Sequence, residues 1–230
     1  MSTRAAIAAS IAYDTIMVFE GQFTDHILPD QIHKINLSFL SPKMRREYGG
    51  CAGNIAYNYA LLGGEAVPMG MVGDDFGPYR DHNLRTGVDQ SCIVTAADAY
   101  TAQCFIVTDL SNNQLAGFHP GAMGRSAEIP LAQAGAVTCG IVGPDAPDAM
   151  VLHTREMAEA GIPFVLDPGQ NILLFSGEQL LAIEKAQEEE RTRLDERVLA
   201  CDQRLETRTL WGTWLGSGLL AGLIYVHSKN

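Results

Sequence analysis

Short apolar runs alternate with helix-length segments through the first 183 residues. Each run is bounded by turn residues and is rich in small or β-branched side chains, a pattern typical of buried strands. The predicted strands are 5–12, 66–72, 137–142 and 162–166. Helices are predicted at 51–62, where the glycine pair 63–64 supplies the stop, and at 147–160. Strands that alternate with helices predict an α/β fold with a parallel sheet and right-handed crossovers.

Two segments alternate apolar and polar residues and do not fit this scheme. Residues 32–39 predict a half-exposed strand, because their isoleucine, leucine and phenylalanine side chains fall on one face. Residues 100–108 and 114–119 flank the polar loop DLSNN and predict a hairpin. These segments are therefore set apart from the core sheet.

The pattern changes sharply at residue 184. Fourteen of the 26 residues in 184–209 are charged, and apolar residues recur among them at three- and four-residue spacing, which predicts a solvated amphipathic helix. Residues 210–226 then carry no charge and hold both tryptophans of the chain. Three interpretations of the tail 210–230 stay open: a membrane anchor at the short limit for a spanning helix, a displaced non-homologous terminus, or another packed element. We favour the displaced terminus and regard membrane attachment as the weaker reading.

Composition excludes several classes of function. The net charge of −11 disfavours nucleic-acid binding, which needs clustered Lys and Arg. Five widely spaced cysteines and six histidines form no motif with disulfide or metal-site spacing. The first ten residues lack the long apolar run of a signal peptide, so we expect a cytoplasmic protein.

The richest candidate chemistry lies in the stretch GGCAGNIAYNYALLGGEAVPMGMVG, residues 49–73. Gly49 and Gly50 allow close approach of a ligand to the backbone, because they have no Cβ. The helix that follows is expected to present unpaired N–H groups at its N-terminus. Asn54, in the first turn, can donate and accept hydrogen bonds. This combination suits a polyhydroxylated small molecule better than a bare phosphate.

The same stretch resembles the first signature of the PfkB (ribokinase-like) family of sugar and nucleoside kinases. The matching positions are Gly49, Gly50, Ala52, Asn54, Ala56, Gly63 and Gly73. The sequence segments YDTIMVFEG, TAQCFIVTD and FHPGAM most resemble those of bacterial adenosine-kinase-like members. The resemblance covers about residues 5–183 and implies a ribokinase-like three-layer α/β/α domain with a small β-sheet lid, truncated after its first half. It places the lid strands within about 15–48 and 100–120, and it implies that the lid can serve as a homodimer contact.

By resemblance, the activity is ATP-dependent phosphorylation of a sugar or nucleoside hydroxyl, with adenosine or another ribose-containing acceptor expected. The family uses ATP and Mg²⁺, a GAGD motif that carries the catalytic base, and an Asn-x-x-Glu motif for the magnesium and phosphate site. The sequence contains neither motif. We therefore assign no catalytic residue, expect no phosphate transfer by this chain, and keep a non-enzymatic nucleoside- or sugar-binding pseudokinase as the alternative. A dinucleotide-binding oxidoreductase is disfavoured, because no GxGxxG follows the first strand.

Four substrate-binding residues are carried over from the family pattern. Asp14 matches the carboxylate that holds substrate hydroxyls, and its alternative is a strand-end aspartate that caps a turn. Gly49, Gly50 and Asn54 are expected at the same substrate, with a purely structural turn as the alternative.

The hairpin adds weaker candidates. Thr101, Gln103 and Phe105 alternate on one face and are predicted to reach the substrate from the lid, with ordinary lid packing as the alternative. His119 is a further candidate near the pocket, although a lone histidine is more often structural.

Most of the other charged residues are expected to have structural or solvent-exposed positions rather than to bind a ligand. Asp74 and Asp75 are expected to cap the following turn rather than bind ligand. Arg45 and Arg46 are expected to be solvated rather than to neutralise phosphate. Asp167 ends a predicted strand and is a minor candidate for the nucleotide side. The sequence leaves open the identity of the acceptor, the oligomeric state, and whether another chain supplies the ATP-binding half.

Overall fold

A computed structural model describes residues 3–27, 33–34 and 36–214, with side chains described as far as residue 200. The chain divides into two compact units, Met1–Glu189 and Glu190–Asn230. The first unit contains two sheets, and helix α4 (Gly177–Trp214) begins in it. The sections below concern this first unit.

The core sheet of the described residues is wholly parallel, in the order β5-β4-β1-β8-β9. Its strands are β1 (Arg4–Ala8), β4 (Glu65–Gly73), β5 (Ile93–Ala96), β8 (Cys139–Val142) and β9 (Phe164–Leu166). β4, β8 and β9 confirm strands predicted from the apolar runs, and β1 is the first part of the run predicted as one strand at 5–12. β5 was not predicted, because it is only four residues long and includes a polar threonine.

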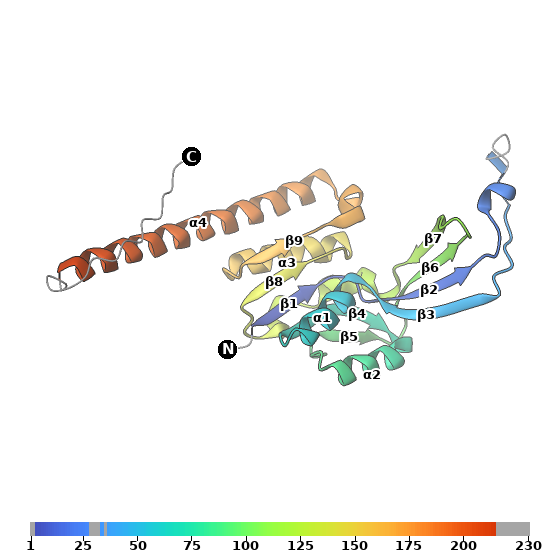
Figure 1. Cartoon of the computed structure of the whole chain (residues 1–230), viewed down its shortest axis with the longest axis horizontal. Helices are drawn as coiled ribbons and strands as arrows, with labels where there is room; N and C mark the ends of the chain where they lie inside the picture. Colours follow the sequence, from blue (N-terminus) through green and yellow to red (C-terminus); the bar gives the residue numbers. More distant parts are fainter. Residues whose placement is uncertain (1–2, 28–32, 35, 215–230) are drawn as a thin grey trace. The chain divides into compact units, whose positions relative to one another are not determined.

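Helices cover both faces of the core sheet and produce three layers (Figure 1). One face, which includes Ile7, packs against α1 (Cys51–Leu61) and α2 (Gly77–Thr86). The opposite face packs against α3 (Pro147–Glu159) and the 3-10 segments η4 (Gly121–Glu128) and η5 (Leu131–Ala134). The fold is thus the expected ribokinase-like α/β arrangement, and the predicted helices α1 and α3 are confirmed.

A second sheet, the lid sheet, extends from the carboxyl ends of the core strands (Figure 1). Its strand order is β3-β2-β6-β7. The strands are β2 (Ala12–Val18), β3 (Lys43–Gly49), β6 (Ala102–Thr108) and β7 (Gln114–His119). β2 pairs in parallel with β6, whereas β2–β3 and β6–β7 are antiparallel. The predicted hairpin is confirmed as β6 and β7.

Two strand predictions were wrong. The single strand predicted at 5–12 is divided, because the chain leaves the core sheet after Ala8 and enters the lid sheet at Ala12. Asp14 therefore lies within a lid strand and not at a strand end. Residues 36–39 form no strand, and Ile32 and Ile35 lie outside the described residues. β3 lies further along the chain, in a charged and solvent-exposed stretch that carries no apolar alternation.

The charged segment 184–209 lies within the continuous helix α4, which begins earlier than predicted, at Gly177. Ser176 and Gln179 form a reciprocal capping box, in which Gln179 N–H donates to Ser176 Oγ (3.2 Å) and Ser176 N–H donates to Gln179 Oε1 (2.8 Å). The apolar run predicted at 210–226 lies outside the described residues after Trp214. No helix within the described part of the chain is long and apolar enough to cross a membrane.

Candidate functional site

Asp14 lies on β2, between Glu47 of β3 and Cys104 of β6. Because side chains alternate along a strand, register partners share one face of the sheet. We call this the Asp14 face. Its members include Asp14, Ile16 and Val18 of β2 with their partners on neighbouring strands, and Phe118 joins the row through its pairing with Cys104.

The Asp14 carboxylate is half-buried, and none of the described residues donates a hydrogen bond to it. Burial raises its pKa, and the nearby Glu47 carboxylate raises it further. A half-buried carboxylate without donors retains its full capacity to accept hydrogen bonds. Asp14 is therefore suited to bind a group that carries adjacent O–H donors.

The two glycines after β3 allow this arrangement. A Cβ at Gly49 would collide with the Asp14 carboxylate. Gly50 has φ of 83°, and a Cβ there would lie 2.5 Å from the Ser10 carbonyl oxygen and 2.6 Å from Ala12 N. Glycine is required at Gly50, and a residue with a Cβ at Gly49 would displace the Asp14 carboxylate, so the structure places Gly49 directly against Asp14.

The N-terminus of α1 is bonded differently from the expectation. Cys51 N–H donates to Ser10 Oγ (3.0 Å) and Ala52 N–H donates to the Ser10 carbonyl oxygen (2.8 Å). The prediction of unpaired N–H groups is wrong at these two positions, because Ser10, in the turn between the two sheets, satisfies both donors. Ser10 is distant in sequence from the helix that it caps, so the sequence near the helix start carries no capping signal.

Asn54 lies beside a different hollow. Its side chain is exposed and lines a cavity of about 210 Å³ with Tyr48, Tyr57 and His82. The rings of Tyr48 and His82 are stacked with centroids 4.4 Å apart. Asp14 is not among the residues that line this cavity. Asn54 and Asp14 therefore do not line this hollow together.

The three hairpin candidates are not gathered on the Asp14 face. Gln103 is the register partner of Tyr13, and Phe105 is the partner of Thr15, so both lie on the opposite side of the lid sheet. We call this the Tyr13 face. Thr101 is fully buried, and its Oγ1 accepts the Gly73 N–H (3.0 Å). These positions fit the alternative of lid packing.

Asp75 was expected to cap a turn and instead contacts the lid. The helix that follows it has no side-chain cap, and the Asp75 carboxylate accepts hydrogen bonds from Thr101 N–H (2.8 Å) and Arg46 Nη2 (3.2 Å). Arg46 is therefore not simply solvated. Arg45 is exposed on the Asp14 face and pairs with Glu47 (3.5 Å).

The remaining candidates lie apart from Asp14. His119 is exposed on the Tyr13 face, where it pairs with Gln103. Asp167 is exposed after β9, and its Oδ1 accepts the Gly169 N–H (2.9 Å) in a local turn. Asp74 is exposed.

Sequence reasoning missed a hollow of about 530 Å³ that begins at Phe118 on the Asp14 face. Phe118 is 51% exposed, and the hollow continues along the loops that follow β8 and β9. Its other lining residues include Met123, Asp145, Asn171, Leu174 and Gln179. An aromatic ring, apolar side chains and a few polar groups together suit a planar heterocycle. The alternation of β7 places Phe118 on the face opposite His119, and that alternation was the available signal.

Asp145 is the most buried carboxyl group that lines this hollow, with 1% exposure. Its Oδ1 accepts the Ala146 N–H (2.7 Å), while Oδ2 is buried and has no partner among the described residues. Burial raises the pKa of Asp145 to about 7, against the opposing effect of the hydrogen bond from the Ala146 N–H. The group is therefore poised between its neutral and ionised forms near neutral pH.

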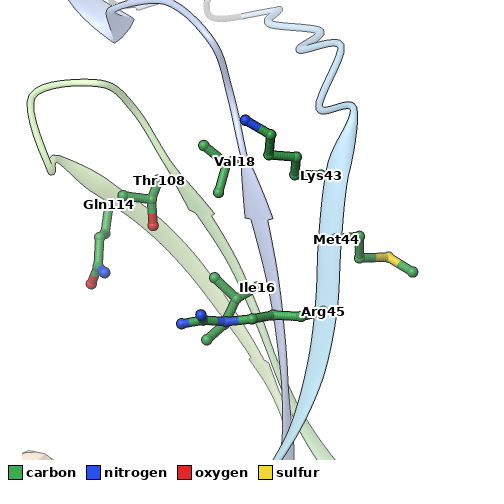
Figure 2. A pocket seen from close by; sticks show the side chains of 7 residues that line it. All are labelled: Ile16, Val18, Lys43, Met44, Arg45, Thr108 and Gln114. Atoms are coloured by element: carbon green, nitrogen blue, oxygen red, sulfur yellow. The ribbon is translucent and has the colours of Figure 1, made fainter.

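The Asp14 face carries a further hollow toward the far end of the lid sheet, of about 410 Å³ (Figure 2). Ile16 and Val18 form its floor on β2, and Lys43 and Arg45 extend from β3 beside them (Figure 2). The Lys43 ammonium pairs with Glu20 (3.0 Å). The Asp14 face thus runs from a carboxylate near the core to cationic side chains at the far end.

A family model described as pfkB family carbohydrate kinase matches residues 14–182. A nucleoside kinase from Methanothermobacter thermautotrophicus is 30% identical over 175 residues, which cover 73% of this chain and 55% of the relative. The chain therefore spans about half the length of this curated relative.

Solved structures agree. The nucleoside kinase of Burkholderia thailandensis in complex with inosine is 48% identical, with a TM-score of 0.69, and the match covers 80% of this chain and 58% of that one. The same enzyme in complex with ADP-inosine matches with a TM-score of 0.66 and 51% identity, over 80% of this chain and 57% of the other.

Proposed function

The chain belongs to the pfkB family of carbohydrate kinases, and on this premise we propose that its first unit forms the nucleoside-binding side of a nucleoside kinase. The observation that carries the proposal is the half-buried Asp14 carboxylate, which accepts no hydrogen bond from the described residues and lies beside Gly49 and Gly50. A carboxylate can accept two adjacent O–H groups, as a ribose presents them. The binding of one ribose would therefore supply the hydrogen bonds that the free protein does not.

The hollow that begins at Phe118 is the proposed place of the base. Phe118 and Asp14 lie in one row across the lid sheet, separated by Cys104. An aromatic ring can stack on the base while Asp145 and the amide groups at the hollow contact its polar edge. The B. thailandensis enzyme, solved with inosine, supports a purine nucleoside as the first ligand to test.

We propose that this chain binds the acceptor without transferring phosphate by itself. In the family, ATP-dependent phosphorylation needs the GAGD and Asn-x-x-Glu motifs, which the sequence lacks. A nucleoside-binding pseudokinase is therefore the form of the proposal that the sequence, without these two motifs, supports best.

Calorimetry of the full chain with inosine tests the binding proposal. Replacing Asp14 by Asn removes the charged acceptor, so affinity should fall about 10- to 100-fold, as expected for hydrogen bonds to a charged group. Asp81→Asn, a substitution of an exposed aspartate on α2, is the matched control and should bind normally. 2′-Deoxyinosine should bind the native chain weakly and should lose little more in Asp14→Asn.

If the loss of affinity caused by 2′-deoxyinosine and the loss caused by Asp14→Asn are additive, the carboxylate does not hold the ribose. An assay with ATP and inosine should yield no inosine monophosphate. Turnover above background that is abolished in Asp14→Asn would refute the proposed lack of phosphate transfer.

We further propose that the outer part of the Tyr13 face is a contact between two copies of the chain. Met44 is 69% exposed and Phe105 is 44% exposed there, and Leu115 lies on the same face. An exposed apolar sheet face of this kind is typical of a protein interface. This proposal assigns Phe105 to association rather than to the substrate.

A further inference from the structure

Asp75 lies in the 3-10 turn η3 (Asp74–Phe76), directly after core strand β4. Its carboxylate accepts three hydrogen bonds and its backbone carbonyl accepts a fourth. The donors are Thr101 N–H to Oδ1 (2.8 Å), Arg46 Nη2 to Oδ2 (3.2 Å), Gln103 Nε2 to Oδ2 (3.3 Å) and the Tyr13 hydroxyl to the carbonyl oxygen (3.1 Å). All four donors belong to the lid sheet or to the residue that leads into it.

The donors come from three different lid strands. Tyr13 is on β2, Arg46 is on β3 and Gln103 is on β6. Tyr13 and Gln103 are register partners, and Arg46 is paired with Thr15, two residues along β2. A single residue of the core therefore contacts three adjacent strands of the lid sheet on one face.

The contacts around Asp75 also support one another. The Arg46 guanidinium carbon lies 3.6 Å from the centroid of the Tyr13 ring, so one cation contacts both the ring and the carboxylate. Tyr13 is almost fully buried. Burial works to raise the pKa of Asp75, but hydrogen bonds from Thr101 and Arg46 outweigh it and hold the pKa below its usual value. The carboxylate is thus retained in its charged, bonded form.

The entry to the lid is packed equally closely. Gly73, at the end of β4, is in contact with the backbone of Tyr100 and Thr101, and a Cβ at Gly73 would collide with both. Asp74 N–H donates to the Ala99 carbonyl oxygen (3.2 Å). The turn that holds Asp75 therefore lies against the segment where the chain passes into β6.

The contacts of Asp75 with the Tyr13 face also affect the Asp14 face, because both faces belong to the same strands. Tyr13 and Asp14 are consecutive on β2 and project to opposite faces, as do Gln103 and Cys104 on β6. Fixing the Tyr13 face against the core therefore fixes where the Asp14 carboxylate lies relative to the core sheet and α1.

We propose that Asp75 is a positioning residue for the acceptor: it holds the lid sheet against the core so that Asp14 lies where the ribose binds. The proposal rests on the proposed function of Asp14. The claim that Asp75 holds the lid sheet against the core can be tested without a ligand. Asp75 acts through the lid strands and does not itself contact the nucleoside.

The test uses the full chain with Asp75→Asn, which keeps the size of the side chain but places an amide among donors. Amide hydrogen exchange should become at least tenfold faster in β2 and β6 and stay unchanged in β1, β4 and β8. Affinity for inosine, measured by calorimetry, should fall at least tenfold. Asp74→Asn, at the exposed neighbouring position, should change neither readout.

Arg46→Met provides a second variant that leaves the core untouched, because Arg46 is on a lid strand with its side chain partly exposed. It should reproduce the faster exchange and the weaker binding, and its effect should not add to that of Asp75→Asn. Faster exchange throughout the core, or a looser lid with unchanged affinity, would overturn the proposal. If the native chain binds no nucleoside, the proposed function fails, while unchanged lid exchange in both variants would separately refute the positioning role.

Discussion

The two faces of the lid sheet use aspartate in opposite ways. On the Asp14 face, a half-buried carboxylate accepts no hydrogen bond from the described residues, and burial and Glu47 raise its pKa. Beside the Tyr13 face, the Asp75 carboxylate accepts three hydrogen bonds, which hold its pKa low despite burial. The two carboxylates differ in how many hydrogen-bond donors the protein itself supplies to them.

This difference separates a binding role from a supporting one. A polar group that is removed from water without partners costs the free protein stability, and a ligand that supplies the partners recovers it. A group that the fold already satisfies stabilises the fold and has little left to offer a ligand. Residue type and location near the core would have made Asp14 and Asp75 look equivalent.

Substitution at Gly49 should give the largest effect on the Asp14 face. A Cβ in Gly49→Ala would collide with the Asp14 carboxylate, which must then move away from its position. We expect loss of measurable inosine binding by calorimetry and a destabilisation of about 1–3 kcal/mol, typical of an overpacked site.

Gly117→Ala is the matched control, because nothing lies within 4 Å of a Cβ built at that position on β7, the other edge strand of the lid sheet. It should bind inosine normally. Normal binding by Gly49→Ala would show that the position of Asp14 does not matter, and the contrast between the faces would lose its functional meaning.

The two aspartates should respond with opposite signs when each is neutralised. Asp75→Asn should lower the free energy of unfolding by about 1–3 kcal/mol at pH 7, because it breaks hydrogen bonds to a charged acceptor. Asp14→Asn should leave it unchanged or raise it by up to about 1 kcal/mol, because it removes an unpaired half-buried charge. Urea unfolding of both variants beside the native chain measures the two values.

The pH dependence should also differ in sign. The pKa of Asp75 is lowered on folding, so its stabilisation is present above the ordinary aspartate pKa and is lost as pH falls through the lower folded value. The pKa of Asp14 is raised, so its contribution is present at low pH and is lost as pH rises through the folded value. The same sign for both variants over pH 3–7 would contradict the comparison.

The smallest effect on the site is expected from Phe105→Ser, on the outer part of the Tyr13 face. Inosine affinity should change by less than about twofold, because the ring lies on the side opposite to Asp14. Sedimentation should instead show weaker self-association, since the exposed apolar area is reduced. A large loss of inosine affinity together with unchanged self-association would instead support the original prediction that Phe105 contacts the substrate.

The core of the fold could be predicted from the sequence because its strands are continuous apolar runs. β4 is buried on both faces between helices, and β8 is buried on one face and partly buried on the other, so both strands contrast strongly with their flanks. β3 could not be found in this way, because its side chains are almost all exposed and backbone pairing with β2 is what makes it a strand. The tail helix was recognised in its charged part, although its capping box at Ser176 was overlooked.

The candidate site was predictable only where a residue's role depends on its own type. Gly49 and Gly50 were recognisable as glycines because a Cβ would collide with the backbone at Gly50 and with the Asp14 carboxylate at Gly49. The division of hairpin residues between two faces depends on the register of β2 with β6, and that register is a tertiary property. The contacts of Asp75 likewise depend on residues that are distant in the sequence.

The parallel pairing of β2 with β6 also bears on the order of folding. β2 follows the first core strand, whereas its partner β6 follows β5, so Ala12 and Ala102 pair although β3, β4, β5 and two helices lie between them in the sequence. Closing so long a loop costs chain entropy before any contact in the lid is gained, and pairings of high sequence separation are slow to form. The acceptor site should therefore be among the last features to appear during folding, and the side of β2 that pairs with β6 should remain an unpaired edge for most of that time.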